Sequence, residues 1–277
     1  MAIRGHKMSR CTSGLQAFLL AYFWICLILI MLCYVSATNS EAAPVDASAA
    51  TGKSVLYVYN KTKLEGAKSV SPSDPARIMA LETWRRNDLK AMAYLQSLGF
   101  KIVGVDESSP ENIAEHQNLI VISESVDAIN VGTKYRNTPV PLITFENDLL
   151  GELEMTGLKN GTDYGTDDNQ RFLWLVNAPH PLSAGLSAGL QNVLTDEHFK
   201  MNWGKPCLGA ITIATLRGAP DKAAIFAYEQ GATMNGEFLA PARRVSFFLW
   251  QDTFEAMKPE GLALFRASIL WAVTPPN

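Results

Sequence analysis

Four short apolar runs in the first half of the chain constrain its fold more than any other feature. They read SVLYVY (54–59), FKIVGV (100–105), NLIVIS (118–123) and VPLITF (140–145). Buried parallel strands are near-continuous runs of Val, Ile and Leu, whereas half-exposed strands alternate apolar and polar residues. The four runs therefore predict parallel strands covered on both faces, as in a doubly wound α/β domain.

Helical spacing separates the first two runs. Between 76 and 98 apolar residues recur every three or four positions, and Gly99 follows where a helix C-terminus favours glycine. A closing helix is predicted over 259–273, because Pro259 suits a first turn and the residues after it can bury a broad apolar face.

The second half of the chain is less regular. Apolar runs at 172–176, 210–216, 223–229 and 244–250 are typical of strands, with few helical patterns between them. This spacing predicts a partly antiparallel C-terminal extension of the mostly parallel sheet. We find no internal repeat, so one domain over 54–277 is the expectation.

The first 37 residues have a different character. Arg4, Lys7 and Arg10 precede an uncharged apolar run over 15–35, and the segment ends in small residues that suit signal peptidase. The run is long enough for a signal peptide that is cleaved or for a retained membrane anchor, and both interpretations stay open. In either case we expect the rest of the chain to lie outside the cytoplasm, joined through a flexible tether at 38–53.

The charge balance sets one class of partner aside. Residues 1–37 contain three of the 24 Lys and Arg residues and none of the 27 Asp and Glu residues, so residues 38–277 carry a formal charge of −6. Nucleic-acid-binding domains concentrate a basic excess on one face, so no nucleic-acid partner is expected. Cys207 is the one cysteine beyond Cys33, which excludes an internal disulfide in the exported part.

The residues that directly follow the predicted strands are the candidates for a binding site. In open parallel sheets the ligand crevice lies beyond the carboxyl ends of the strands. Glu146 follows the fourth run and could act as a general acid or base, or could cap the next helix together with Asn147 and Asp148. Ser123, Asn147 and Asp252 are predicted to bind a ligand at the same edge.

Other reactive side chains lack the pattern that their chemistry needs. Ser123 is not flanked by the glycines of a G-x-S-x-G elbow, and Cys207 is followed by a strand pattern instead of a helix. His180, Glu197 and His198 do not have the spacing of a helix-borne metal pair. We therefore expect no serine or cysteine nucleophile, no metal and no cofactor.

His180 stands between two prolines in NAPHPLSAGL (177–186). Pro179 and Pro181 restrict the backbone and disfavour helix for the residues before them. The stretch predicts a rigid turn, and His180 is also a candidate to touch a ligand.

Three segments together resemble the trehalose-utilisation (ThuA-like) family and its class I glutamine-amidotransferase-like relatives. HPLSAGL followed by TDEHF is similar to a His-Pro-x-x-x-Gly-Leu turn and a later Asp-Glu pair in that group. The ending over 243–274 looks like its closing strand and helix. The stretch GTKYRNTPVPLITFENDLLGELEMTG resembles a subgroup of uncharacterised exported domains with the same arrangement.

The resemblance spans roughly 54–273 and implies a flavodoxin-like sheet with a connection to sugar metabolism or carbohydrate binding. Two positions depart from the family. Trp250, Gln251 and Asp252 stand where ThuA-like proteins often have a Gly-His pair, and the amidotransferase Cys-His-Glu triad is missing.

Three functions follow as hypotheses. The first is an exported domain that binds a small polar ligand, such as a carbohydrate, at the strand-end edge. The second is a carbohydrate-active hydrolase or isomerase in which Glu146 is the acid or base. The third is a non-catalytic interaction module.

Overall fold

The computed structural model describes residues 47–65 and 74–275. Its strands are β1 (Ser54–Tyr59), β2 (Lys101–Asp106), β3 (Leu119–Ile122), β4 (Leu142–Thr144), β5 (Tyr164–Gln170), β6 (Phe172–Leu175), β7 (Gly189–Asn192), β8 (Phe199–Gly204), β9 (Ile211–Leu216), β10 (Ala219–Tyr228) and β11 (Arg244–Phe247). The helices are α2 (Lys61–Glu65), α3 (Pro75–Ser97), α4 (Ala128–Val131), α5 (Thr253–Ala256) and α6 (Pro259–Val273), with 3-10 helices η1 (Ala47–Ala50), η3 (Glu111–His116), η4 (Asn147–Leu149), η5 (Pro181–Ser183) and η6 (Asn235–Glu237).

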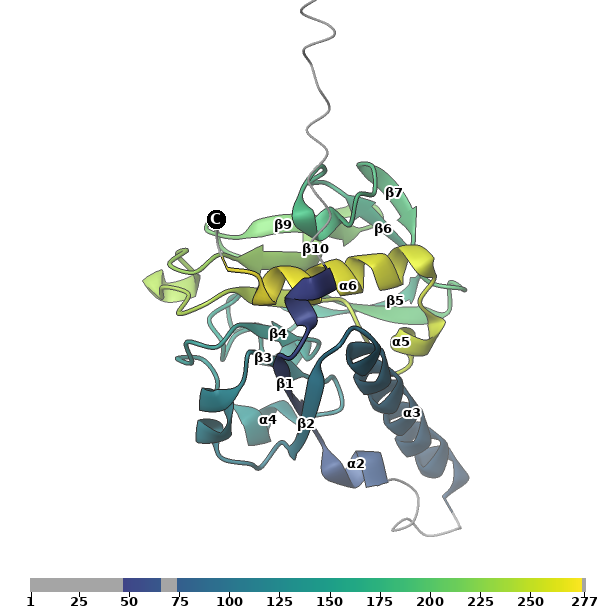
Figure 1. Cartoon of the computed structure of the whole chain (residues 1–277). Helices are drawn as coiled ribbons and strands as arrows, with labels where there is room; N and C mark the ends of the chain where they lie inside the picture. The colour runs from purple at the N-terminus through teal and green to yellow at the C-terminus, as the bar shows by residue number, and fades with distance from the viewer. Residues whose placement is uncertain (1–46, 66–73, 276–277) are drawn as a thin grey trace, which may run out of the picture. The chain divides into compact units, whose positions relative to one another are not determined.

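The 11 described strands form one mixed sheet (Figure 1). Its main path runs β2-β1-β3-β4-β11-β10-β9-β6-β7, and β8 pairs with both β5 and β10. The neighbours from β2 to β11 are parallel, whereas the pairs from β11 through β10, β9 and β6 to β7 are antiparallel. The predicted α/β class and its antiparallel extension are therefore confirmed.

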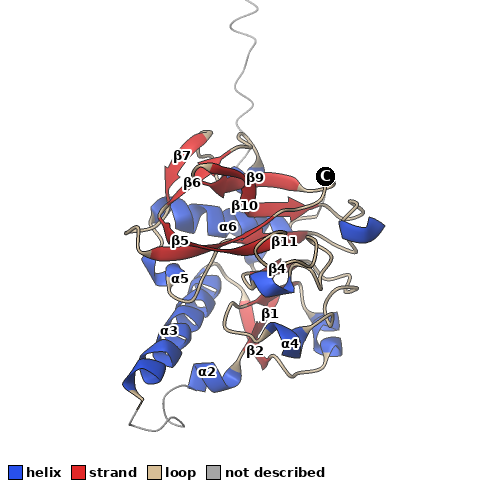
Figure 2. Ribbon diagram, turned by 180° about the vertical axis from the view of Figure 1, so that it is seen from behind, coloured by secondary structure: helices blue, strands red, loops and turns tan. Residues whose placement is uncertain are grey.

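The two faces of the parallel strands are covered differently. Helices α3 and α6 cover one face (Figure 1), and Val55 and Tyr57 of β1 belong to the same buried apolar cluster as Leu95 of α3 and Phe265 of α6. The other face is covered by α4, short 3-10 helices and loops (Figure 2), because the connections over 107–118 and 123–141 are short and contain helix-breaking Pro and Gly residues. Helices were expected on both faces, and because this second face has only α4 and short 3-10 helices, the doubly wound, flavodoxin-like arrangement is not confirmed.

Helix α3 is positioned by local signals that the sequence contains. Asp74 is its N-cap and accepts a hydrogen bond from the Arg77 amide, and Pro75 occupies the first turn. Gly99 lies just beyond the helix with φ +102°, a conformation that glycine adopts without strain. These boundaries match the helix predicted over 76–98.

The described fold begins before the first predicted strand. Residues 47–50 form η1, and Ala50 is fully buried in the core between the sheet and α6, although a flexible tether was predicted over 38–53. The predicted signal peptide or anchor at 1–37 lies outside the described residues. Within 47–65 and 74–275 no helix combines the length and apolar character that crossing a membrane requires.

Arg244, at the start of β11, is a fully buried cation, and among the described residues no carboxylate pairs with it. Its guanidinium group donates to the carbonyl oxygens of Val140 (3.1 Å), Arg243 (3.2 Å), Thr138 (2.6 Å) and Arg136 (3.3 Å). Burial lowers the pKa of Arg244 to about 10. The side chain thereby fastens the segment before β4 to β11, where the parallel and antiparallel parts of the sheet meet.

Arg244→Lys is expected to lower the free energy of unfolding by about 2–4 kcal/mol, because a lysine ammonium cannot span these carbonyl oxygens and leaves buried acceptors unpaired. Urea denaturation of the full-length protein measures the loss. Arg217→Lys is the matched control, since Arg217 is half exposed and its Nη1 lies 3.9 Å from Glu197; its effect should stay within about 0.5 kcal/mol. Equal stabilities for the two variants would contradict the assignment.

Candidate functional site

The polar side chains that follow β1, β2 and β3 lie at one edge of the sheet. The chain passes from β1 to β2 on one side and then returns to β3 on the other side of β1. Ligands of open α/β sheets bind beyond the carboxyl ends of the strands at such a change of direction. Asn60 and Ser123 stand on either side of this point.

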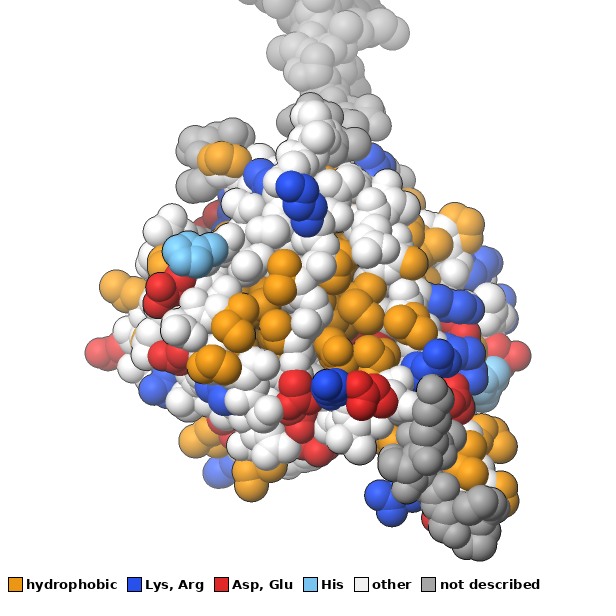
Figure 3. Space-filling view, turned by 60° about the horizontal axis from the view of Figure 1, so that its bottom comes forward, with side chains coloured by type: hydrophobic (Ala, Val, Ile, Leu, Met, Phe, Trp, Pro, Cys, Tyr) orange, Lys and Arg blue, Asp and Glu red, His pale blue; other side chains and the backbone are white. Residues whose placement is uncertain are grey.

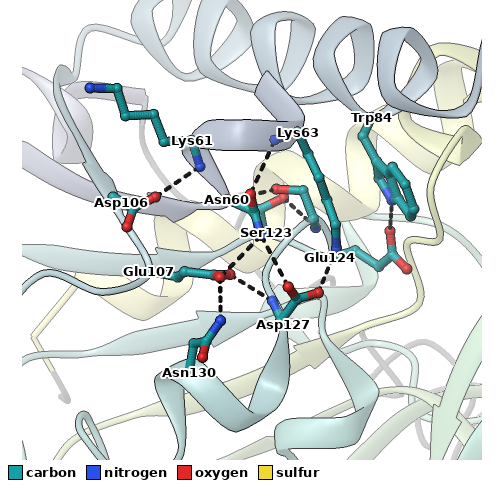
Figure 4. Close-up of polar contacts among 11 residues, drawn as sticks. Asn60, Lys61, Lys63, Trp84, Asp106, Glu107, Ser123, Glu124, Asp127 and Asn130 are labelled. Carbon is teal, nitrogen blue, oxygen red and sulfur yellow. Dashed lines mark hydrogen bonds and ion pairs between the residues drawn. The ribbon is translucent and has the colours of Figure 1, made fainter. Parts of the chain in front are cut away.

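Polar groups at this edge form a connected network around the buried side chains of Asn60 and Glu107 (Figure 4). Glu107 Oε1 accepts hydrogen bonds from the side-chain amides of Asn60 (3.0 Å) and Asn130 (2.7 Å), and its Oε2 accepts from the Asp127 amide (2.6 Å). The Asp127 carboxylate in turn accepts hydrogen bonds from Lys63 Nζ (2.8 Å) and from the side-chain amide of Asn60 (3.2 Å). The network fixes these side chains in place, which preorganises them for binding.

A cavity of about 1030 Å³ opens beside this network. Its walls come from the ends of β1 and β2, the loop after β3, and helices α2 and α3. The lining residues are Asn60, Thr62, Lys63, Asp74, Arg77, Ala80, Leu81, Trp84, Asp106, Glu107, Ser108, Asp127 and Asn130. The surface viewed from beneath the sheet shows acidic and basic side chains next to one another (Figure 3), and the cavity likewise contains both signs of charge.

Glu124 and Glu146 form a buried pair of carboxyl groups. Both follow neighbouring parallel strands, two residues beyond the paired Ile122 and Thr144. Glu124 accepts a hydrogen bond from Trp84 Nε1 (2.9 Å), and burial followed by the charge of Glu146 raises its pKa well above the usual range. Burial raises the pKa of Glu146 to about 8. The pair can hold a proton near neutral pH.

Glu146 also caps the short helix η4, since its Oε1 accepts from the Asp148 amide (2.8 Å). Capping is one of the two roles that the sequence left open for Glu146, and its role as a general acid or base stays a prediction. Glu146 is not in the lining of the 1030 Å³ cavity.

Ser123 is held by a third acid, Asp88 of α3. Its hydroxyl donates to Asp88 Oδ1 and accepts from the Ser125 amide (3.0 Å). Asp88 Oδ1 also accepts from the Tyr57 hydroxyl (2.8 Å). Because both sides of the Ser123 hydroxyl are engaged, it is positioned as a structural hydrogen-bonding group.

Asn147 is buried between η4 and the antiparallel strands. Its amide donates to Thr166 Oγ1 (3.4 Å), whose hydroxyl donates to Asn202 Oδ1 (2.7 Å). Asn202 donates to the carbonyl oxygens of Phe145 and Leu249, each at 2.8 Å. Asn147 thus belongs to a chain of amides that supports the strand ends, outside the cavity lining.

His180 lies at the opposite end of the sheet. It caps η5, where its Nδ1 accepts from the Leu182 amide (3.1 Å), and its ring centroid is 6.4 Å from that of Trp271. Burial lowers the pKa of His180, and the charge of Arg243 lowers it further, whereas the charge of Glu229 acts in the opposite direction. Tyr228, just before Glu229, pairs with the first residue of β11, so His180 is at the amino end of that strand, away from Glu146.

Asp252 follows the carboxyl end of β11, but its side chain does not line the large cavity. It occupies the N-cap position of α5 without a capping hydrogen bond. Burial raises its pKa, and the nearby charges are those of His198, Glu255 and Lys200. It lines neither the large cavity nor a smaller cavity under α3.

Cys207 and the His, Asp and Glu side chains considered as metal ligands do not form a common site among the described residues. Cys207 is free and partly exposed, with its Sγ 3.9 Å from Asn235 Oδ1. In the part of the chain that the structure describes, no group of three or more His, Cys, Asp or Glu side chains is arranged to hold a metal ion.

Inspecting the residues that directly follow the predicted strands did not identify the site residues that lie on helices. Asp88 and Trp84 are on α3, and Lys63 is on α2. A signal for Asp88 was present, because it shares the inward stripe of α3 with Leu81, Ala91 and Leu95, all of which are buried. A carboxylate on an apolar helix stripe marks a buried polar partner or a site.

No family model matches the chain, and no curated protein matches it. Several solved structures are similar to the chain at low identity. Three of them are a provisionally assigned GMP synthase component of Thermoplasma acidophilum (10% identity, 78% of this chain and 92% of that one, TM-score 0.46), a provisionally assigned ThuA-like protein of Bacteroides uniformis (12%, 80% and 92%, TM-score 0.47) and the N-terminal domain of mmIFT52 (11%, 79% and 98%, TM-score 0.40). At this level of similarity no activity carries over to this chain.

Glu146→Gln is expected to flatten the pH dependence of stability. Because the folded-state pKa of Glu146, about 8, lies above the unfolded value, its stabilising contribution is present at low pH and is lost as the pH rises through that pKa. Between about pH 5 and 8 the wild-type free energy of unfolding should fall by on the order of 1–3 kcal/mol, a decline that belongs to the Glu124 and Glu146 pair.

Urea denaturation at several pH values measures both slopes. Glu197→Gln, at a half-exposed position remote from the pair, should keep the wild-type slope. A Glu146→Gln protein with that same slope would show that the pair does not titrate in this range.

Proposed function

We propose that the domain binds a small polar ligand, such as a carbohydrate, in the cavity at the carboxyl ends of β1, β2 and β3. The observation that carries the proposal is the cavity of about 1030 Å³ at the change of strand direction, lined by mutually hydrogen-bonded polar side chains of which Asn60 and Glu107 are buried. Such a volume accommodates one small ligand.

The chemistry of the wall suits hydroxyl groups. Asp106, Asp127 and Glu107 present oxygen acceptors, while Asn60 and Asn130 have amides that donate and carbonyls that accept. Trp84 adds an apolar ring to the wall, with Lys63 Nζ 4.5 Å from its centroid. A ligand with many hydroxyl groups and apolar C–H surface between them matches this combination of partners.

Binding without acyl-transfer chemistry is the simplest role for this site. The Ser123 hydroxyl is engaged by Asp88 and Ser125, and Cys207 is not in the cavity lining. The proposal includes export, because the apolar run over 15–35 follows three basic residues, as in a signal peptide or an anchor.

Asp127→Asn is expected to weaken ligand binding about tenfold, because a charged acceptor is replaced by a neutral one. Saturation-transfer NMR of the full-length protein with a panel of mono- and disaccharides identifies the ligand, and calorimetry measures its Kd. Asp168→Asn is the control, since this exposed residue on β5 pairs with Lys200. If no sugar in the panel binds, or both variants bind equally, the proposal fails.

Acid or base catalysis on a carbohydrate is the second candidate, and one observation favours it. The pKa of Glu146, about 8, would let it donate or accept a proton near neutral pH beside Glu124. If the domain hydrolyses or isomerises a sugar, Glu146→Gln should lower kcat by about 100-fold or more, with folding checked by circular dichroism. Full activity in that variant would remove Glu146 from the reaction.

A further inference from the structure

A second, much smaller cavity lies under α3, and it is separate from the cavity of the proposed function. Its volume is about 20 Å³, enough for one group the size of a water molecule. It is bordered by the carboxyl ends of β1, β3, β4 and β11 and by α3 and α5. The lining residues are Tyr57, Trp84, Asn87, Asp88, Ala91, Ser123, Glu124, Ser125, Phe145, Leu249, Trp250, Gln251 and Phe254.

Asp88 brings an unpaired oxygen atom to this cavity. Only 4% of the residue is exposed, and Oδ1 accepts from the hydroxyl groups of Tyr57 and Ser123. Oδ2 is buried and accepts no hydrogen bond from the residues that the structure describes. A buried carboxylate oxygen without a donor is costly, so the adjoining space calls for a group that supplies one.

The cavity contains a second acid and no cation of its own. Glu124 lines it as well, with Oε2 bonded to Trp84 Nε1. No Lys, Arg or His is among the lining residues. Lys63, whose charge acts on both acids, bonds to Asp127 and lies over the Trp84 ring outside the lining.

Aromatic side chains make up much of the remaining wall. They are Tyr57, Trp84, Phe145, Trp250 and Phe254. The faces of aromatic rings carry partial negative charge and attract cations, most strongly where water is excluded. Burial raises the pKa of both Asp88 and Glu124, so a small positive charge in this space would favour their ionised forms and be complementary to them.

We propose that this cavity binds an ammonium group, supplied either by the free ammonium ion or by the –NH3⁺ end of a primary amine. An ammonium group has directed N–H donors, one of which satisfies Asp88 Oδ2, and it is close to water in size. A neutral water would supply the donor but no charge. Mg²⁺ and Ca²⁺ require six or more oxygen ligands, which two carboxylates in an aromatic wall do not provide.

Thermal unfolding of the full-length protein at about pH 8, where amines stay protonated, tests the site. A ligand that binds only the folded state raises Tm as its concentration rises. Ammonium chloride should raise Tm above sodium chloride and potassium chloride at the same ionic strength. A bound ¹⁵N-ammonium signal, protected from exchange with water, should appear by NMR over the same concentrations.

Two further salts identify the source of the group. A response to ammonium alone assigns the free ion, whereas an equal or stronger response to methylammonium assigns the end of a primary amine. Tetramethylammonium carries the charge without N–H donors and should produce no shift.

Two isosteric variants localise the effect. Asp88→Asn and Glu124→Gln should each raise the half-saturating ammonium concentration about tenfold or more. Asp88→Asn should still fold, because its side-chain oxygen can keep the hydrogen bonds from Tyr57 and Ser123. Asp168→Asn serves as the exposed control and should respond as the wild type.

Three results would overturn the proposal: no difference between ammonium and the sodium and potassium salts, a wild-type response in Asp88→Asn and Glu124→Gln, or a tetramethylammonium response equal to that of ammonium. Failure here leaves the larger cavity untouched, since its ligand and the Asp127→Asn variant are measured separately.

Discussion

The buried guanidinium of Arg244 is the constraint on which the arrangement of the sheet depends. Strand β11 is the only partner that joins β4 to β10 along the main path of the described sheet, and it does so with parallel pairing on one side and antiparallel pairing on the other. A charge in that position must find several acceptors, and the carbonyls of 136–140 provide them. The carboxyl ends of β4 and β11 thereby continue the edge formed by those of β1 and β3, and the small cavity lies there.

The strands that the sequence predicted are those with an apolar run of their own. Strands β5, β7 and β8 were missed because their residues are largely polar or glycine, as in YGTDDNQ and GLQN. Strand β8 did contain a period of two, since Phe199, Met201 and Trp203 are buried apolar residues that alternate with Lys200 and Asn202. Pairing with partners distant in sequence, which no local pattern encodes, determines where such strands lie.

The residues of the site also fall into those that the sequence predicted and those that it missed. Residues placed by the ends of parallel strands, such as Ser123 and Glu146, could be anticipated because topology alone brings those ends together. Asp88 was missed, although it shares the inward stripe of α3 with buried apolar residues, because the hydrogen bonds that it makes depend on how α3 packs against the sheet. His180, between two prolines, could be interpreted from its local sequence. Its ring caps η5, a role that its own sequence neighbours determine.

Trp84 borders both cavities, and its indole N–H is bonded to Glu124. Any occupant that shifts this ring on one side changes the wall available on the other. Thermodynamic linkage then requires the effect to be reciprocal: the factor by which a guest in the large cavity alters affinity for the small one equals the factor in the reverse direction. One tryptophan side chain would in this way make two separate binding equilibria interdependent.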